Sequence, residues 1–137
     1  MIILDTDVLS ALMLSEPDEA VASWLDRQAR NSIWTTSVTL FEIRYGLEIM
    51  PTGRRRSGME SAFARLIREK LESRVVVFDE AAADAAAILM GRRRRNGQLR
   101  DTMVAGIALA QRAALATRNV RHFDDIDVTV VNPWKSS

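Results

Sequence analysis

Three acidic residues that lie far apart in the sequence occupy positions suited to catalytic chemistry. Asp5 directly follows an apolar run at residues 2–4 (IIL), which is typical of a short buried strand. Ligand sites in open α/β sheets form beyond the carboxyl ends of the strands, so Asp5 is predicted to lie at such a site. Glu42 stands inside an apolar helical pattern, and Asp101 begins another. Carboxylates are hard oxygen ligands that suit magnesium or manganese, and such a cation can activate water for hydrolysis.

Each of these acids also has a structural interpretation that involves no chemistry. Asp5 could end a strand and cap the helix that follows, and Asp101 could cap the helix that it begins. Glu42 could be a solvated helix residue, which is the commoner fate of a glutamate. The sequence spacing leaves open whether Glu42 and Asp101 approach Asp5 in the fold.

The elements that would position these acids follow an α/β pattern, because short apolar runs alternate with helical periodicity. Strands are expected at residues 2–4, 33–35, 75–78, 115–117 and 128–131. Helices are expected over residues 8–14, from Pro17 onward, from Ser37 or Thr39 to Met50, and over 57–72, 80–90 (broken by Asn96-Gly97) and 101–113. Strands that read as continuous apolar runs are typical of a sheet covered on both faces. We therefore predict a three-layer α/β/α domain with a mainly parallel central sheet.

Composition limits the kinds of protein and of site that the chain can form. A length of 137 residues corresponds to one domain, residues 1–137, and 47% hydrophobic with 27% charged residues is typical of a globular protein. The lack of cysteine excludes a thiol nucleophile, a cysteine zinc site and an iron–sulfur cluster. The N-terminus has no basic leader and only a short apolar run, so we expect no signal peptide, no transmembrane helix and a cytoplasmic location.

Four segments resemble, in order and at matching spacing, the motifs of PIN-domain toxin ribonucleases of the VapC type, which include FitB-like members. They are residues 4–9 (LDTDVL), 39–46 (TLFEIRYG), 99–105 (LRDTMVA) and 116–123 (ATRNVRHF), and the ending NPW at 132–134 is also frequent in such toxins. The resemblance covers essentially the whole chain. It implies a PIN-domain fold and an endoribonuclease that hydrolyses RNA phosphodiester bonds with Mg²⁺ or Mn²⁺, leaving a 5′-phosphate and a 3′-hydroxyl.

The resemblance also assigns roles to individual residues. Asp5, Glu42 and Asp101 match the family's acids and would hold the metal, with Asn119 as a fourth catalytic position. Asn119 stands where the family often has an acid, so a second metal would be held more weakly than by a carboxylate.

Two further acids enter the prediction because of departures from the family pattern. Asp7 stands where the family often has asparagine, which places an extra carboxylate beside Asp5. Asp124 lies close enough in sequence to Asn119 to be a candidate substitute ligand.

Basic residues stand where they could contact an anionic substrate. The arginine run at residues 92–95 precedes the third motif, and either it or the run at 54–56 could guide RNA; alternatively both are solvated helix ends. Arg44 and Arg100 adjoin proposed metal ligands and could contact the scissile phosphate. His122, the only histidine, is expected at the surface or in packing.

The resemblance implies two protein partners, a second copy of the chain in a homodimer and a VapB-type antitoxin that wraps the toxin and blocks its site. No membrane partner is expected. The helices around Trp24 and over residues 59–71 carry more apolar surface than a small sheet needs, although an intramolecular core is the favoured interpretation of both.

Two other functions compete with a ribonuclease. A strand followed by Asp5-Thr6-Asp7 also resembles the opening of haloacid-dehalogenase-type phosphatases, in which the first aspartate is a nucleophile. That chemistry needs a well-placed lysine, and the chain has only Lys70 and Lys135. The other alternative is a non-catalytic PIN-like domain that binds RNA or a partner. Metal-dependent cleavage of RNA distinguishes the three.

Overall fold

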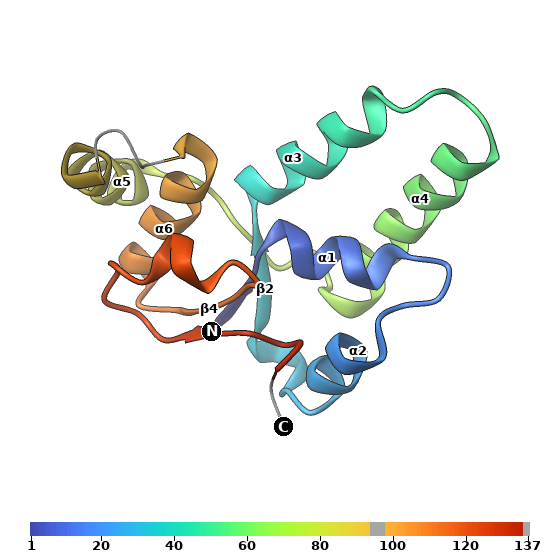
Figure 1. Cartoon of the computed structure of the whole chain (residues 1–137), viewed down its shortest axis with the longest axis horizontal. Helices are drawn as coiled ribbons and strands as arrows, with labels where there is room; N and C mark the ends of the chain where they lie inside the picture. Colours follow the sequence, from blue (N-terminus) through green and yellow to red (C-terminus); the bar gives the residue numbers. More distant parts are fainter. Residues whose placement is uncertain (94–97, 136–137) are drawn as a thin grey trace.

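The protein, described by a computed structural model for residues 1–93 and 98–135, is built on a five-stranded parallel sheet (Figure 1). The strand order is β3-β2-β1-β4-β5, and all four strand pairs are parallel. The strands are β1 (Ile2–Leu4), β2 (Ile33–Thr36), β3 (Val75–Val76), β4 (Ala114–Ala116) and β5 (Val130–Val131). In the central strand Ile3 is in register with Trp34 on β2 and with Leu115 on β4.

Helices cover both faces of this sheet, as the apolar strands predict. One layer holds α1 (Thr6–Met13), α2 (Glu19–Asp26), α3 (Ser37–Glu48) and α4 (Arg54–Arg65), which continues as a π-helical turn, Leu66–Lys70. The other holds α5 (Glu80–Arg93) and α6 (Leu99–Gln111), at the left in Figure 1. Ile3 and Leu4 are both fully buried, but they belong to different cores. The α/β/α prediction is therefore confirmed, and the acids are held between two cores.

Trp24 and the apolar residues of α4 belong to the intramolecular core, the interpretation that the sequence favours. Trp24, Phe63, Leu66 and Leu71 are all buried and pack in the same core as Leu4. Apolar burial of this kind contributes roughly 1.5–3 kcal/mol for each large side chain.

Several predicted boundaries are wrong in detail. The strand expected at 75–78 ends at Val76, because the Phe78 amide leaves the sheet and donates to Ser37 Oγ (3.1 Å). The strand expected at 128–131 begins only at Val130. Asp101 lies in the first turn of α6, whose N-cap position is Gln98, so the capping interpretation of Asp101 is wrong. The predicted break at residues 96–97 lies outside the described residues.

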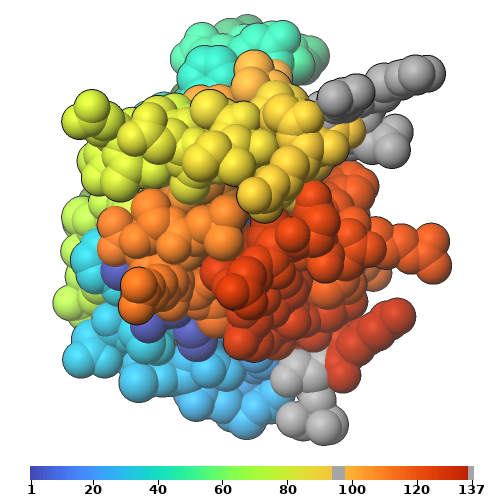
Figure 2. Space-filling view, turned by 90° about the vertical axis from the view of Figure 1, so that its left-hand side faces the viewer, coloured from blue at the N-terminus to red at the C-terminus, as the bar shows by residue number. Residues whose placement is uncertain are grey.

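The alanine-rich helix α5 packs against α6 at very short range. A Cβ atom added to Gly106 on α6 would lie 2.6 Å from the Ala82 carbonyl oxygen and 2.7 Å from Ala86 Cβ. Figure 2 shows α5 in yellow lying alongside and above α6 in orange. The small residues of both helices let their backbones approach where Gly106 meets the first half of α5.

The strand order creates a point at the sheet's carboxyl edge where two chain connections diverge. From β1 the chain winds outward through β2 and β3, and it then crosses to β4 on the other side of β1. Ligand sites in open parallel sheets lie at such switch points. Asp5 follows β1 and Thr117 follows β4, so both lie at this position. Within the described residues, no helix has the length and apolar character needed to cross a membrane.

Candidate active site

Asp5 lies at the centre of the site and is buried, with 5% of its surface exposed. It caps α1, because its Oδ1 accepts from the Thr6 amide (2.9 Å), while its Oδ2 accepts from the hydroxyl of Thr117 (2.9 Å). Burial, followed by repulsion from Asp7 and a smaller repulsion from Asp101, raises the pKa of Asp5 from 3.8 to about 7. Asp5 can therefore cap α1 and also belong to a ligand site, because Oδ1 accepts from the first helical amide while both oxygens lie at the switch point.

Thr117 joins Asp5 and Asp7 from the neighbouring strand. Its hydroxyl lies 3.3 Å from Asp7 Oδ2, which also accepts from the Arg118 amide (2.8 Å). Burial raises the pKa of Asp7 against these hydrogen bonds. Asp7 Oδ1 is buried and has no hydrogen-bond donor among residues 1–93 and 98–135. A buried carboxylate oxygen without a donor is costly, and a cation or water would satisfy it.

Glu42 enters the site from α3, whose start is fixed by Thr36 Oγ1 accepting from the Thr39 amide (3.0 Å). Burial raises the pKa of Glu42, and repulsion from Asp101 adds to the rise, while Thr6 and Arg100 oppose it. Arg100 Nη1 lies 3.7 Å from Glu42 Oε2.

Arg100 is also held by aromatic rings beside Glu42. Its guanidinium lies 5.8 Å from the ring centroids of both Phe41 and Tyr45, which stack on each other on α3. This places a half-exposed cation at the rim of the acidic site, and its contact with a phosphate stays a prediction.

Asp101 enters from the first turn of α6 and pairs with the only histidine. His122 Nδ1 lies 2.8 Å from Asp101 Oδ2, with 20% of the Asp101 side chain and 44% of the His122 side chain exposed. His122 is in the short 3₁₀ segment Val120–Phe123 that follows β4. His122 is exposed, as the sequence predicts, and its ring also lies beside a proposed ligand.

The other predicted residues lie at the margin of this group. Asn119 is exposed just beyond β4, and its amide donates to Thr117 Oγ1 (3.1 Å). Asp124 lines the same hollow as Asp101, a space of about 400 Å³. The Arg44 guanidinium lies over the Phe63 ring on α4, 5.3 Å from its centroid. Roles for Asn119, Asp124 and Arg44 in binding stay predictions.

The two arginine runs each contain one arginine whose side chain is largely buried and ion-paired. Arg56 pairs with Glu48 (3.3 Å) and Glu60 (3.5 Å), and only 16% of its side chain is exposed. Arg93 is still more deeply buried, with 8% of its side chain exposed and Asp125 as its ion-pair partner. Neither of these two is therefore a solvated helix end or a free guide for RNA. Arg94 and Arg95 lie outside the described residues.

The candidate ligands are oxygen donors, which suits a divalent cation, although the described residues do not place three of them around one point. The acids come from β1, α1, α3 and α6, and all the candidate ligating atoms are oxygens. Within the described part of the chain, no three acidic or histidine side chains form a ready-made metal cluster. Carboxylates that share a site raise one another's pKa, and a bound cation would relieve that repulsion. The raised pKa of Asp5 and the unpaired Asp7 oxygen fit a site that a cation would neutralise.

Comparison with known proteins identifies the fold family. The family model described as PIN domain matches residues 2–128. The chain belongs to the PIN-domain family. Among curated PIN-domain relatives it is similar to the VapC ribonuclease Y4jK of Sinorhizobium fredii, at 34% identity, with 98% of this chain and 99% of the relative covered. It is also similar to the toxin FitB of Neisseria gonorrhoeae, at 28% identity, with 98% of this chain and 99% of the relative covered.

A solved structure extends the family assignment to three dimensions. The chain is similar to one in the structure of FitAB bound to an IR36 DNA fragment, with a TM-score of 0.86 and 27% identity, and 100% of this chain and 98% of that chain covered. The predicted recognition and fold are therefore confirmed. The phosphatase alternative belongs to a different fold family, and Lys70 pairs with Asp26 (4.0 Å) on α2, away from the acids.

Proposed function

We propose that this PIN domain is a metal-dependent endoribonuclease and the toxin of a toxin–antitoxin pair. The observation that carries the proposal is the burial of Asp5 at the switch point, where desolvation, followed by the charges of Asp7 and Asp101, raises its pKa to about 7. Asp5, Glu42 and Asp101 would hold Mg²⁺ or Mn²⁺, Glu42 directly or through a water. The full-length similarity to proteins named VapC ribonuclease and toxin FitB supports RNA as the substrate.

The residues of this chain would contribute position and charge to the reaction. The Thr6 amide and the Thr117 hydroxyl hold both oxygens of Asp5, so its carboxylate is oriented before a substrate arrives. Arg100 is held beside Glu42 by two rings and would contact the scissile phosphate. A bound divalent cation would supply activation of water and stabilisation of the charge that develops on the phosphate.

Cleavage of a single-stranded RNA in Mg²⁺, in Mn²⁺ and in EDTA tests the proposal. We expect cleavage only with a divalent cation, products with 5′-phosphate and 3′-hydroxyl ends, and no cleavage by Asp101→Asn. Full activity in EDTA would exclude the metal mechanism. Binding of RNA without cleavage under all three conditions would support the non-catalytic alternative instead.

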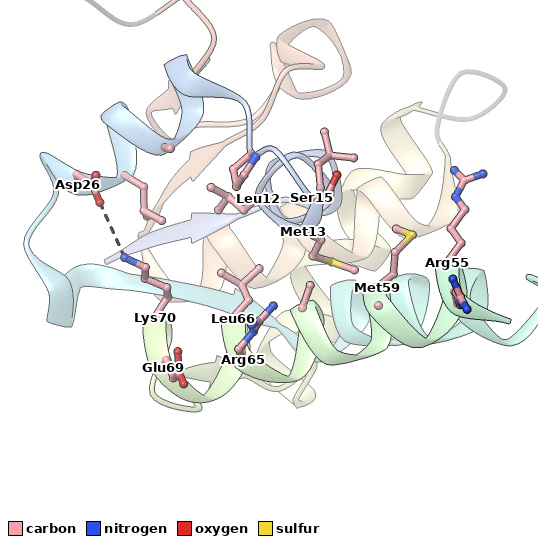
Figure 3. Close-up of a pocket in the computed structure, with 17 residues that line it drawn as sticks. Leu12, Met13, Ser15, Asp26, Arg55, Met59, Arg65, Leu66, Glu69 and Lys70 are labelled. Carbon is pink, nitrogen blue, oxygen red and sulfur yellow. Dashed lines mark ion pairs between the residues drawn. The ribbon is translucent and has the colours of Figure 1, made fainter.

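An apolar groove about 940 Å³ in volume lies between α1, α2 and the α4 segment (Figure 3). Met13 of α1 and Met59 and Leu66 of the α4 segment face one another across it. Its rim carries four basic residues and two acidic ones, namely Arg54, Arg55, Arg65, Lys70, Asp26 and Glu69. We propose that the occupant is an amphipathic antitoxin helix with an apolar face and acidic flanks, since such a helix complements both the lining and the rim.

Met59→Arg tests this seat, because it places a charge on a partly buried apolar position of the groove. We expect the variant to cleave RNA normally and to escape inhibition by the antitoxin, taken as the product of the adjacent upstream reading frame. Inhibition equal to that of the unchanged protein would exclude the groove as the antitoxin seat.

A patch of exposed apolar side chains on α3 and α6 supports the homodimer. Phe41, Tyr45 and Ile49 follow one another at four-residue spacing and are 58%, 49% and 66% exposed, and Leu99 is 65% exposed. We propose that a second copy of the chain covers this patch, in a protein that acts in the cytoplasm. Sedimentation of Ile49→Asp should then show a monomer where the unchanged chain is dimeric.

A further inference from the structure

Arg93 is a buried arginine whose four hydrogen bonds all reach segments that flank Asp101. It ends α5, and 8% of its side chain is exposed. Its Nε and Nη2 donate to the two oxygens of Asp125 (2.9 and 2.7 Å) in a bidentate pair. Its Nη1 donates to Thr102 Oγ1 (2.9 Å), and its Nη2 also donates to the carbonyl oxygen of His122 (2.6 Å).

These contacts converge on one carboxylate from two directions. Thr102 directly follows Asp101 on α6 and is fully buried, and its hydroxyl donates in turn to the Gln98 carbonyl (2.7 Å). His122 contacts Asp101 Oδ2 through its ring and Arg93 through its backbone. Arg93 therefore ties the first turn of α6 to the 3₁₀ segment. Among residues 1–93 and 98–135, none hydrogen-bonds to the second carboxylate oxygen, Asp101 Oδ1.

We propose that Arg93 and His122 are positioning residues that together orient the Asp101 carboxylate for the divalent cation. The inference rests on the proposed function, since it takes Asp101 as a metal ligand. Carboxylates and imidazoles that hydrogen-bond to a metal's ligands hold those ligands in place, and their loss typically lowers metal affinity about 10–100-fold.

The planar fork of Arg93 is the feature that a lysine could not reproduce. A guanidinium presents five donors in fixed directions, whereas an ammonium group is a point charge on a flexible stem. Arg93 uses its fork on three residues at once, and its guanidinium also lies 6.0 Å from the ring centroid of the fully buried Phe123. Arg93→Lys keeps the charge and removes the simultaneous contacts, so it separates position from charge.

Arg74 provides a matched control on the opposite side of the molecule. Its side chain is 14% exposed and donates to the carbonyl oxygens of Ile33 (2.8 Å), Arg30 and Lys70 (3.2 Å). Arg74→Lys thus removes a guanidinium that is also largely buried, without touching the acidic site. A merely structural role for Arg93 would make the two variants behave alike.

The first experiment measures Mn²⁺ binding by calorimetry without RNA, together with the thermal midpoint. We expect Arg93→Lys and Arg74→Lys to lose similar thermal stability. Only Arg93→Lys and His122→Phe should weaken Mn²⁺ binding, by about 10–100-fold. In cleavage assays at fixed Mg²⁺, the same two variants should lose kcat with little change in KM. Mn²⁺ affinity equal to that of Arg74→Lys would overturn the proposal.

The second experiment reads the geometry of His122 directly by NMR, independently of any activity. Because His122 is the only histidine, its ring nitrogens give unambiguous signals in the tag-free protein. We expect a hydrogen-bonded Nδ1–H signal that disappears in Asp101→Asn and shifts in Arg93→Lys. An unchanged signal in Arg93→Lys would refute the positioning role proposed for Arg93. Failure of the unchanged protein to bind Mn²⁺ or to cut RNA would refute the proposed function and, with it, the role assigned here to Arg93 and His122.

Discussion

Replacing Asp5 by asparagine should stabilise the folded protein at alkaline pH while it abolishes RNA cleavage. The folded-state pKa of Asp5 is raised from 3.8 to about 7. A carboxyl whose pKa is raised by folding contributes stability that is complete below pH 4 and is lost as pH rises through 7. Above pH 7 the chain therefore folds with an ionised carboxylate that its surroundings disfavour.

The size of this effect follows from the interval between the two pKa values. At roughly 1.4 kcal/mol for each pH unit, 3.8 to about 7 corresponds to about 4 kcal/mol as an upper limit. Asparagine retains an oxygen for the Thr6 amide, so the cap survives. Allowing for relaxation of the site, we expect a gain of about 2 kcal/mol at pH 8, or about 5–10 °C in thermal midpoint.

Thermal unfolding of Asp5→Asn and the unchanged protein in EDTA, from pH 5 to pH 8.5, measures this difference. The matched control is Asp18→Asn, since Asp18 is the N-cap of α2, where it accepts from the Ala20 and Val21 amides, but it is not buried among other acids. The control should change the midpoint little at any pH. If Asp5→Asn is no more stable than the unchanged protein at pH 8, or if its gain is the same at pH 5, the electrostatic account of Asp5 is wrong.

Three further variants test neighbouring features. Asn119→Asp should lower the Mg²⁺ concentration for half-maximal cleavage and Asn119→Ala should raise it, whereas identical metal titrations would place residue 119 outside the site. Asp7→Asn removes the second-largest cause of the raised Asp5 pKa, so the pH at which thermal stability declines should move downward while cleavage persists. Gly106→Ala should cost about 1–3 kcal/mol in urea unfolding because its Cβ meets the Ala82 carbonyl at 2.6 Å. Gly46→Ala, with open space around it on α3, should instead be neutral or stabilising, and equal effects at the two glycines would refute the packing argument.

The sequence predicts the part of the site that depends on strand ends. Asp5 follows a strand whose apolar run is unmistakable, and parallel topology places its carboxyl end at a ligand edge. The roles of Glu42 and Asp101 as metal ligands are implied by the resemblance to the family, because spacing within a helix does not say which helices meet. The interaction of Thr117 with Asp5 needs two strands to be adjacent, although Thr117 itself stands within the fourth motif.

The contacts of Arg93 and His122 around Asp101 could not be predicted from the sequence. Arg93 reads as one member of a charged run, and runs of like charge are usually solvated. Its burial depends on Asp125 and His122, which lie 32 and 29 residues away in the sequence and meet Arg93 only in the folded chain. The overlong strand predicted at 75–78 has a similar cause, since β3 is an edge strand whose pairing ends where Ser37 captures the Phe78 amide.

The hydrogen bond between Asp5 and Thr117 joins residues 112 positions apart in the chain. During synthesis β1 leaves the ribosome first, whereas its neighbour β4 is made near the end. Until then Asp5 has neither the Thr117 hydroxyl nor the Ala116 carbonyl that accepts from its amide (3.0 Å). Contacts that close such long loops also form late in folding. The proposed metal site would therefore be complete only when translation of the chain is nearly finished.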